Sequence, residues 1–278
     1  MSDRRSSEPN RSGVHILSAR RVIADLVRSS GVRTGDLVLD FGAGAGAITA
    51  PLAATGARVL AVERDDEFVR CLRRRFAEVR NVRVVHADLR SVPLPRRRYA
   101  VVASVPFALS TYLVRRLLHP PRTALARADL VVEWGFAKRL TDPYPRSLEA
   151  AWWSARFEPH LRRRVDRGSF TPEPKVDAAH LVVRRREEVD HRMQRIVWAL
   201  LSAAYAAPEL PVRSLLRGFV PRRRARRLLT SSGIDPPTAA RAVSVPQWTR
   251  LAAALGADHA VSLPPLPRRL DRAGLPRR

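Results

Sequence analysis

Five short apolar runs, separated by stretches with helical periodicity, constrain the fold of this 278-residue chain more than any other feature. The runs cover residues 37–41, 58–63, 82–86, 99–103 and 129–133. They are apolar almost throughout instead of alternating with polar residues, which indicates strands that are buried on both faces. Such strands alternating with helices predict a parallel sheet with helices on both sides. Two further candidate strands, 153–165 and 178–184, would complete the sheet.

The pattern changes to helical around Glu187. Residues 191–206 predict a first helix, 221–232 a very basic second helix, and 246–255 a third. We therefore expect an α/β, Rossmann-like domain over residues 13–186 and a small basic helical domain over 187–256. Residues 1–12 are polar, and residues 257–278 are rich in proline and arginine without periodicity, so both are expected to be tails.

The charge of the chain indicates the kind of partner. Lys+Arg number 51 against 26 Asp+Glu, a formal net charge of +25. A positive field of this size favours a polyanion, most commonly nucleic acid. A GC-rich genome would explain why arginine replaces lysine, which occurs only at Lys138 and Lys175. It does not explain a twofold excess of basic over acidic residues.

Cysteine usage and hydropathy limit the class of protein further. Cys71 is the only cysteine, which excludes an internal disulfide and a cysteine-based zinc site, and we expect no bound metal. Residues 1–12 lack the apolar segment of a signal peptide, and no apolar run is long enough to span a membrane. We expect a soluble cytoplasmic protein, and nothing in the sequence requires an oligomer.

Three strand ends carry residues suited to binding a nucleoside cofactor. The first strand runs into a glycine-rich loop with Gly42 and Gly44, where the backbone can approach a ligand closely. Glu63 ends the second strand, where a carboxylate can accept from both ribose hydroxyls. Asp88, followed by Leu89, ends the third, where it could accept from an adenine amino group. Alternatively, each acid caps a following helix, and the loop alone would also suit NAD.

The fourth strand runs into Ser104-Val105-Pro106-Phe107, a pattern similar to the (Asn/Asp/Ser)-x-Pro-(Tyr/Phe) motif of amino-group methyltransferases. An adenine amino nitrogen is a poor nucleophile because its lone pair is delocalised into the ring. Two acceptors, the Ser104 side chain and the Val105 carbonyl, would favour a pyramidal nitrogen with a free lone pair. Pro106 would fix the turn, and Phe107 would stack on the extruded base. The alternative is an ordinary turn with a buried phenylalanine.

With these residues together, the chain resembles the rRNA adenine dimethyltransferases, which comprise the erythromycin-resistance (Erm) enzymes and the small-subunit dimethyltransferases. The resemblance covers about residues 13–186 and, more loosely, the helical end. Its most specific segment is 170–177, similar to the family pattern F-x-P-x-P-x-V-D, and residues 130–140 also match. Residues 182–186 look closer to the Erm branch. The resemblance implies S-adenosylmethionine as cofactor and an adenine N6 of rRNA as substrate.

The family's N-terminal motif, Gly-Gln-(Asn/His)-Phe-(Leu/Ile), corresponds to residues 13–17 here. The resemblance places His15 and Leu17 at the methionine end of the cofactor, while Val14 cannot make the polar interaction of the usual glutamine. Ser104 replaces the usual asparagine with a shorter acceptor. Phe107 replaces the usual tyrosine and keeps its stacking face.

The leading hypothesis is methylation of an unpaired adenine of 23S rRNA, with macrolide resistance as the result. Phosphates would be contacted by basic residues, namely Arg222, Arg223, Arg226 and Lys138. The alternatives are a small-subunit (16S) rRNA dimethyltransferase and a non-catalytic RNA-binding protein on the same scaffold. An NAD-dependent oxidoreductase would leave residues 104–107 without a role. The sequence leaves mono- versus dimethylation and the target nucleotide open.

Overall fold

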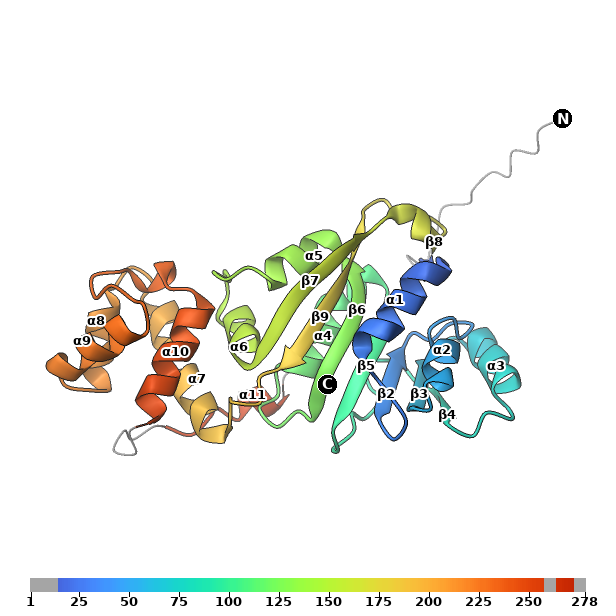
Figure 1. The fold of residues 1–278 in the computed structure, drawn as a ribbon, viewed down its shortest axis with the longest axis horizontal. Coiled ribbons are helices and arrows are strands. Elements are labelled where there is room, and N and C mark those ends of the chain that lie inside the picture. Colours follow the sequence, from blue (N-terminus) through green and yellow to red (C-terminus); the bar gives the residue numbers. More distant parts are fainter. Residues whose placement is uncertain (1–14, 258–263, 273–278) are drawn as a thin grey trace.

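The computed structural model describes residues 15–257 and 264–272, which form an α/β domain and a smaller helical domain (Figure 1). The strands are β1 (Ile16–Leu17), β2 (Leu37–Phe41), β3 (Arg58–Glu63), β4 (Val82–His86), β5 (Tyr99–Ser104), β6 (Leu125–Glu133), β7 (Phe157–Val165), β8 (Phe170–Thr171) and β9 (Ala178–Arg185). The α-helices are α1 (Arg20–Ser30), α2 (Thr49–Ala54), α3 (Asp66–Arg75), α4 (Ser110–Leu118), α5 (Trp134–Leu140), α6 (Leu148–Arg156), α7 (His191–Ala206), α8 (Val212–Leu215), α9 (Arg222–Ser231), α10 (Val245–Gly256) and α11 (Arg269–Arg272). Short 3₁₀ helices form at η1 (Phe107–Leu109), η2 (Arg167–Ser169), η3 (Leu216–Gly218) and η4 (Ala240–Ala242).

Seven strands form the central sheet in the order β4-β3-β2-β5-β6-β9-β7. Strands β4, β3, β2, β5 and β6 are parallel, whereas β9 pairs antiparallel with both β6 and β7. The chain builds outward from β2 to β4 and then returns to place β5 on the other side of β2. This reversal opens a crevice at the carboxyl ends of β2 and β5, where open α/β sheets bind their ligands.

Both faces of the central strands β2, β5 and β6 are largely buried, as the apolar runs predict. Val38 in β2 and Val102 in β5 belong to the core under α1 and α2. Their neighbours Leu39 and Val101 point to the other face and join the core that contains residues of α4, α6 and α7. Successive side chains of a strand alternate between faces, so only an apolar run can fill both cores. The predicted fold class, a Rossmann-like α/β domain with a small helical domain, is confirmed.

The candidate strand over 153–165 is wrong in its first four residues, which form the end of α6. Ser147 caps this helix by accepting from the backbone N–H of Ala150 at 3.2 Å. At its other end the buried Arg156 donates to the carbonyl oxygens of Pro120, at 2.7 Å, and Pro121, at 3.2 Å. These contacts, to the turn that follows α4, favour a helix over the predicted strand at residues 153–156. The sheet also differs from an all-parallel one, because β9 runs opposite to its neighbours.

The helical domain lies beside the β7 edge of the sheet, at the opposite end of the molecule from β4 (Figure 1). Its α7, α9 and α10 match the three predicted helices to within one residue at each end. Asp190 caps α7 by accepting from the N–H of Met193 at 2.7 Å, and Ser244 with Gln247 forms a capping box on α10. Helix α7 contacts both α6 and α10, which joins the two domains through one apolar core.

Residues 264–272 differ from the expected unstructured tail. Leu270 is buried, with 1% of its surface exposed, and the Arg269 guanidinium lies 5.9 Å from the centroid of the Trp198 ring on α7. Arg195 Nε also donates to the Pro264 carbonyl at 3.0 Å. Two leucines, Leu266 and Leu270, among prolines and arginines give no periodic signal, so sequence patterns could not predict this packing. The remaining residues of both predicted tails lie outside the described ranges, except Ala257.

Candidate active site

A cavity of about 450 Å³ opens at the crevice between β2 and β5. All eight residues predicted to bind the cofactor line this cavity, namely His15, Leu17, Gly42, Gly44, Glu63, Asp88, Leu89 and Ser104. The structure thus brings together residues from β1, the ends of β2, β3, β4 and β5, and the loops that follow them. Val14 lies outside the described residues.

The glycine loop after β2 is held by the Glu63 carboxylate. Gly42, Gly44 and Gly46 have φ values of 71°, 52° and 85°, in the left-handed region that glycine tolerates best. The Gly44 N–H donates to Glu63 Oε2 at 2.9 Å. The other oxygen, Oε1, accepts from the N–H groups of the next two residues, at 2.7 and 2.9 Å. Glu63 therefore fixes the loop against the end of β3 in addition to facing the cavity.

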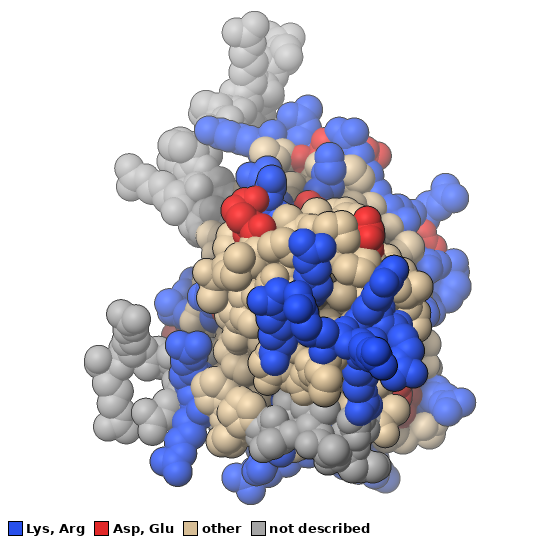
Figure 2. Space-filling view, turned by 90° about the vertical axis from the view of Figure 1, so that its left-hand side faces the viewer, with Lys and Arg blue, Asp and Glu red and all other residues tan. Residues whose placement is uncertain are grey.

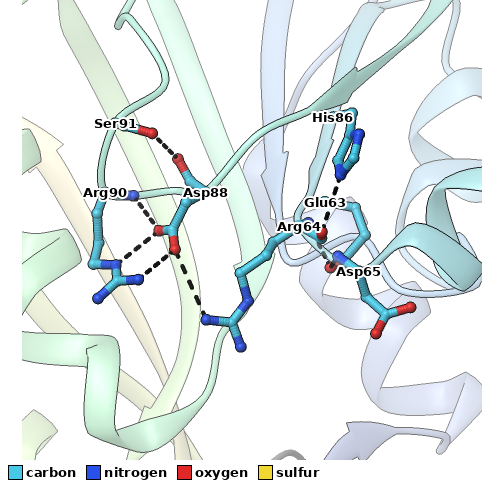
Figure 3. A network of polar contacts seen from close by, with 7 residues as sticks. All are labelled: Glu63, Arg64, Asp65, His86, Asp88, Arg90 and Ser91. Atoms are coloured by element: carbon cyan, nitrogen blue, oxygen red, sulfur yellow. Dashed lines mark hydrogen bonds and ion pairs between the residues drawn. The ribbon is translucent and has the colours of Figure 1, made fainter.

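Asp88 is bound by arginines at the rim of the cavity, as Figure 3 shows. Arg90 donates from Nε and Nη2 to its two oxygens, at 3.0 and 2.6 Å, and Arg64 lies 3.8 Å away. The hydrogen bond from Arg90 is the largest of the favourable contacts that hold the pKa of Asp88 below its usual range. Asp88 is thus kept ionised and hydrogen-bond accepting. A ligand group that binds there must share these oxygens with Arg90.

The segment that follows Asp88 is also fixed from α4. Arg116, which is 9% exposed, donates to the carbonyl oxygens of Leu89 and Val92. These contacts hold Leu89 in the cavity wall. Sequence reasoning did not identify Arg116 or Arg90, because neither belongs to a recognisable motif and both act through tertiary contacts.

Sequence reasoning also missed Asp40, although it precedes the glycine loop directly. Its side chain is fully buried and lines the cavity. Thr49 Oγ1 donates to Oδ2 at 2.7 Å, whereas Oδ1 has no hydrogen-bond partner among the residues that the structure describes. Burial is the main cause that raises the pKa of Asp40 to about 7. The hydrogen bond from Thr49 lowers this pKa, and the negative charge of Glu63 raises it further. A buried carboxyl with one free oxygen is suited to a ligand with a cationic N–H donor.

The N-terminal motif meets the 170–177 segment across one wall of the cavity. Strand β1 pairs antiparallel with β8. His15 Nδ1 lies 2.8 Å from the Pro172 carbonyl oxygen, and because a carbonyl only accepts, this nitrogen carries the hydrogen. The His15 ring centroid is 6.2 Å from that of Phe107, which meets Phe170 edge-on at 6.0 Å. These contacts position Phe107 from two separate segments of the chain.

The motif after β5 forms the turn that the sequence predicts. Ser104 ends the strand, Val105 is buried, and Phe107 begins η1 half-buried. Ser104 and Pro106 line the cavity, whereas Val105 and Phe107 are not among the lining residues. Within the described part of the chain, the Ser104 hydroxyl has no hydrogen-bond partner, so it is available to a substrate.

An arginine surface covers α8 and α9 at the far end of the helical domain. Arg222 and Arg226 line a hollow of about 530 Å³ together with Arg213 and Arg217, which sequence reasoning did not single out. None of these four has an ion-pair partner within residues 15–257 and 264–272. Figure 2 looks onto this end of the molecule and shows basic side chains gathered over it. Arg223 is exposed on α9, whereas Lys138 is exposed on α5, apart from this surface (Figure 1).

The described residues contain neither a candidate metal centre nor a candidate membrane-spanning helix. No group of three or more histidine, cysteine or acidic side chains there could hold a metal ion. No helix among them is long and apolar enough to cross a membrane. The sheet order, the glycine loop and the strand-end acids instead define the class of S-adenosylmethionine-dependent methyltransferases.

Comparison with known proteins narrows this class. The family described as "Ribosomal RNA adenine dimethylase" matches residues 6–256, so the chain belongs to that family. An rRNA adenine N-6-methyltransferase of Bacillus licheniformis is 30% identical over 246 residues, 88% of this chain and 86% of the relative. The mycinamicin-resistance protein MyrB of Micromonospora griseorubida is 35% identical over 232 residues, 82% of this chain and 72% of the relative.

A solved structure supports the same assignment. The crystal structure of the 23S rRNA methyltransferase ErmE has a TM-score of 0.74 and 27% identity, and it covers 86% of this chain and 99% of ErmE. The resemblance to this family and the enzyme class, an rRNA adenine-N6 methyltransferase, are therefore predicted correctly from the sequence.

Proposed function

We propose that this chain transfers a methyl group from S-adenosylmethionine to N6 of an unpaired adenine in 23S rRNA, and thereby confers resistance to macrolide-type antibiotics. The observation that carries the proposal is the position of Ser104. It ends β5 at the cofactor-sized cavity, with a free hydroxyl, next to a turn that leads into a half-buried phenylalanine. This arrangement suits an extruded adenine. In an NAD-dependent oxidoreductase the turn at residues 104–107 would have no role.

The residues of the cavity fit S-adenosylmethionine. This cofactor carries an ammonium group, a ribose, an adenine and a sulfonium, and when bound it supplies an electrophilic methyl group. Asp40 has a free buried oxygen for the ammonium, and the open glycine loop leaves room for a close backbone approach. Glu63 would accept from the ribose hydroxyls, while Asp88 and Leu89 would contact the adenine. His15 and Leu17 would line the methionine end.

The residues after β5 would orient the target base. Ser104 Oγ and the Val105 carbonyl oxygen would accept the two amino hydrogens, which frees the nitrogen lone pair. Phe107, held by His15 and Phe170, would stack on the base. No general base is required, because the amino nitrogen becomes acidic as its new bond forms and releases its proton to an acceptor or to water.

The arginine surface would bind the RNA backbone. Arg222, Arg223 and Arg226 are exposed, as is Lys138 nearer the cavity, and such cations position RNA by contacting phosphates. Base flipping costs least where the adenine is already unpaired, which favours a loop as target.

The choice of 23S rRNA draws support from the ErmE and MyrB similarities, since one is a 23S rRNA methyltransferase and the other a mycinamicin-resistance protein. A methylated adenine has extra bulk and one fewer donor hydrogen where a drug packs against it. Drug binding would then weaken without any other change in the ribosome.

The test is to express the protein in a macrolide-sensitive bacterium, measure the inhibitory concentration, and map methylated adenines in both rRNAs by mass spectrometry. We expect methylation of one 23S adenine and a raised inhibitory concentration. Methylation confined to 16S rRNA would assign the protein to the small-subunit branch. Cofactor and RNA binding without methylation of either rRNA would favour a non-catalytic RNA-binding role.

A further inference from the structure

A second cavity, of about 680 Å³, lies at the ends of β6, β7 and β9, and the proposed reaction does not use it. One wall is the junction of β6 and α5, with Glu133 and Trp134. A second wall is the end of β7, with Arg164, and the start of η2, with Arg167. The third is the 173–177 part of the segment after β8. It is a mixed polar cavity with one large aromatic ring, a composition suited to a nucleobase with its phosphate.

The second cavity lies next to the position proposed for the target adenine. Strands β5 and β6 are neighbours, with Ser104 paired to Val131, and Glu133 ends β6 two residues later. Neighbouring strands lie about 4.8 Å apart. The segment after β8 borders both cavities, since Pro172 lines the first and Lys175 the second. A nucleotide adjacent to an adenine at Ser104 would therefore reach the second cavity.

Trp134 offers a stacking surface in the second cavity. It is half-buried, packs against the main core, and its backbone N–H donates to the Asp177 carbonyl at 3.0 Å. The Arg164 guanidinium lies 5.9 Å from its ring centroid and also contacts the Asp177 carboxylate. The indole is thus fixed in place, as a stacking platform for a base must be.

The charges of the cavity are only partly neutralised by one another. Arg164 pairs with Asp177, and Arg167 lies 3.4 Å from Glu173. Glu133 and Lys175 have no ion-pair partner in the described part of the chain. Gly135 makes room for the Glu133 carboxylate, because a Cβ at that position would lie 2.8 Å from Glu133 Oε1. The cavity therefore offers one free carboxylate and one free ammonium group.

We propose that this second cavity binds the unpaired nucleotide next to the target adenine and prefers guanine there. The base would stack on Trp134, Glu133 would accept from N1–H and N2–H of guanine as two parallel hydrogen bonds, and Lys175 would contact a phosphate. Uracil and adenine present no such pair of adjacent donors to a carboxylate. The inference rests on the proposed function, because it requires that the adenine binds at Ser104.

The experiment uses the full chain and a short RNA hairpin whose loop holds one adenine flanked by guanosines. In one set of RNAs, each flanking guanosine in turn is replaced by 6-methylisoxanthopterin, a fluorescent guanine analogue that keeps the N1–H and N2–H donors and is quenched when it stacks. In a second set, each is replaced by inosine, which lacks the amino group of guanine. RNA affinity, fluorescence and methyl transfer are measured separately, and S-adenosylhomocysteine affinity reports on the first cavity.

We expect wild-type protein to quench the guanine analogue at one flank, and inosine at that flank to weaken binding. Trp134→Leu should abolish the quenching and weaken binding by roughly 5- to 100-fold, the range for removing one stacked base. Glu133→Gln should weaken binding to the guanosine RNA by about fivefold or more and leave binding to the inosine RNA less affected. Both variants should retain wild-type S-adenosylhomocysteine affinity. The control, Glu158→Gln, changes an exposed glutamate at the opposite end of β7 and should alter none of these values.

The proposal is overturned if neither flank is quenched, or if inosine and Glu133→Gln leave affinity unchanged. These two readings need no tryptophan variant, so they decide the matter even if Trp134→Leu fails to fold. Quenching and guanine preference without methyl transfer would support the second cavity while contradicting the proposed function. Methyl transfer without quenching or a guanine preference at either flank would support the proposed function and contradict the role of the second cavity.

Discussion

The cofactor cavity and the arginine surface of α8 and α9 are built in opposite ways. In the cavity, Glu63 accepts from three backbone N–H groups and Asp40 is wholly buried, so the polar atoms are fixed before any ligand arrives. On the arginine surface, Arg222 and Arg226 are exposed side chains without ion-pair partners in the described residues. On the proposed function, the first region would bind its ligand through preorganised geometry and the second would bind through charge.

This difference predicts different responses to pH, salt and mutation. A buried carboxyl with one unpaired oxygen costs folding stability that a bound cation can offset, whereas exposed arginines cost little. Contacts in a buried cavity are weakly screened by salt, but exposed cations lose affinity for phosphates steeply as salt rises. Each of the following experiments contrasts the two regions.

The largest effect is expected at Asp40. Its folded-state pKa of about 7 lies above the unfolded value of 3.8, so the protonated form is favoured in the folded protein. The contribution of Asp40 to folding stability should therefore fall as pH rises from about 4 to 7, by about 4 kcal/mol, and remain level above that. Asp40→Asn should remove this fall and raise stability at pH 8, while weakening S-adenosylhomocysteine binding.

Denaturant unfolding of both proteins between pH 4 and pH 8, with calorimetry of cofactor binding, checks this prediction. Asp36→Asn, an exposed aspartate just before β2, serves as control and should keep the wild-type pH dependence. Equal slopes for wild type and Asp40→Asn would show that Asp40 titrates normally in the folded protein.

The next effect concerns the arginine surface. Replacing Arg222, Arg223 and Arg226 by alanine should reduce the slope of log RNA affinity against log salt concentration. The slope should fall by up to roughly three units, one for each phosphate that is no longer neutralised. Stability and S-adenosylhomocysteine affinity should not change. RNA binding measured from low to physiological salt provides the slope. An unchanged slope would move the RNA-binding surface to the catalytic domain, where Lys138 lies.

At the target-base position, Phe107→Ala should reduce methyl transfer by removing a stacking interaction of about 1–3 kcal/mol. Ser104→Ala should also reduce it, and Ser104→Asn should hold or raise the rate if the longer side chain suits the amino group. Cofactor affinity should largely survive all three changes, because these residues act mainly on the target base. Single-turnover rates with saturating cofactor test this, and full turnover in both alanine variants would exclude adenine from this strand end.

The smallest effects are expected at the strand-end acids. Glu63→Ala and Asp88→Ala should each weaken S-adenosylhomocysteine binding by roughly 1–3 kcal/mol, because each removes a hydrogen-bond acceptor for the nucleoside. The Asp88 variant should show the smaller effect, because Asp88 would accept from the adenine amino group alone and shares its oxygens with Arg90, whereas Glu63 would accept from both ribose hydroxyls and also holds the glycine loop. Arg90→Ala tests this explanation, because it frees the oxygens of Asp88 and should strengthen S-adenosylhomocysteine binding. Wild-type affinity in both acid variants would refute their assignment.

Much of the fold follows from local patterns in the sequence. Residues 37–41, 58–63 and 82–86 are strands with the bounds that the apolar runs predict. Residues 37–41 are buried throughout, as a strand covered on both faces requires, whereas 82–86 form the partly exposed edge strand β4. The glycines after β2 and the turn at 104–107 are equally local. Backbone freedom at Gly42 and the fixed φ of Pro106 belong to those residues themselves.

The tertiary structure alone decided how distant segments complete the site. His15 and Pro172 meet across 157 positions through the β1–β8 pair, and no periodicity encodes such a pairing. The reversed direction of β9 likewise depends on how the chain returns to the sheet. Asp40 acquires a raised pKa only through burial, and Arg90 reaches Asp88 only when the turn after β4 forms. Sequence determined which chemical groups the protein carries at each strand end, whereas their contacts, burial and charge state depend on neighbours that only folding brings within reach.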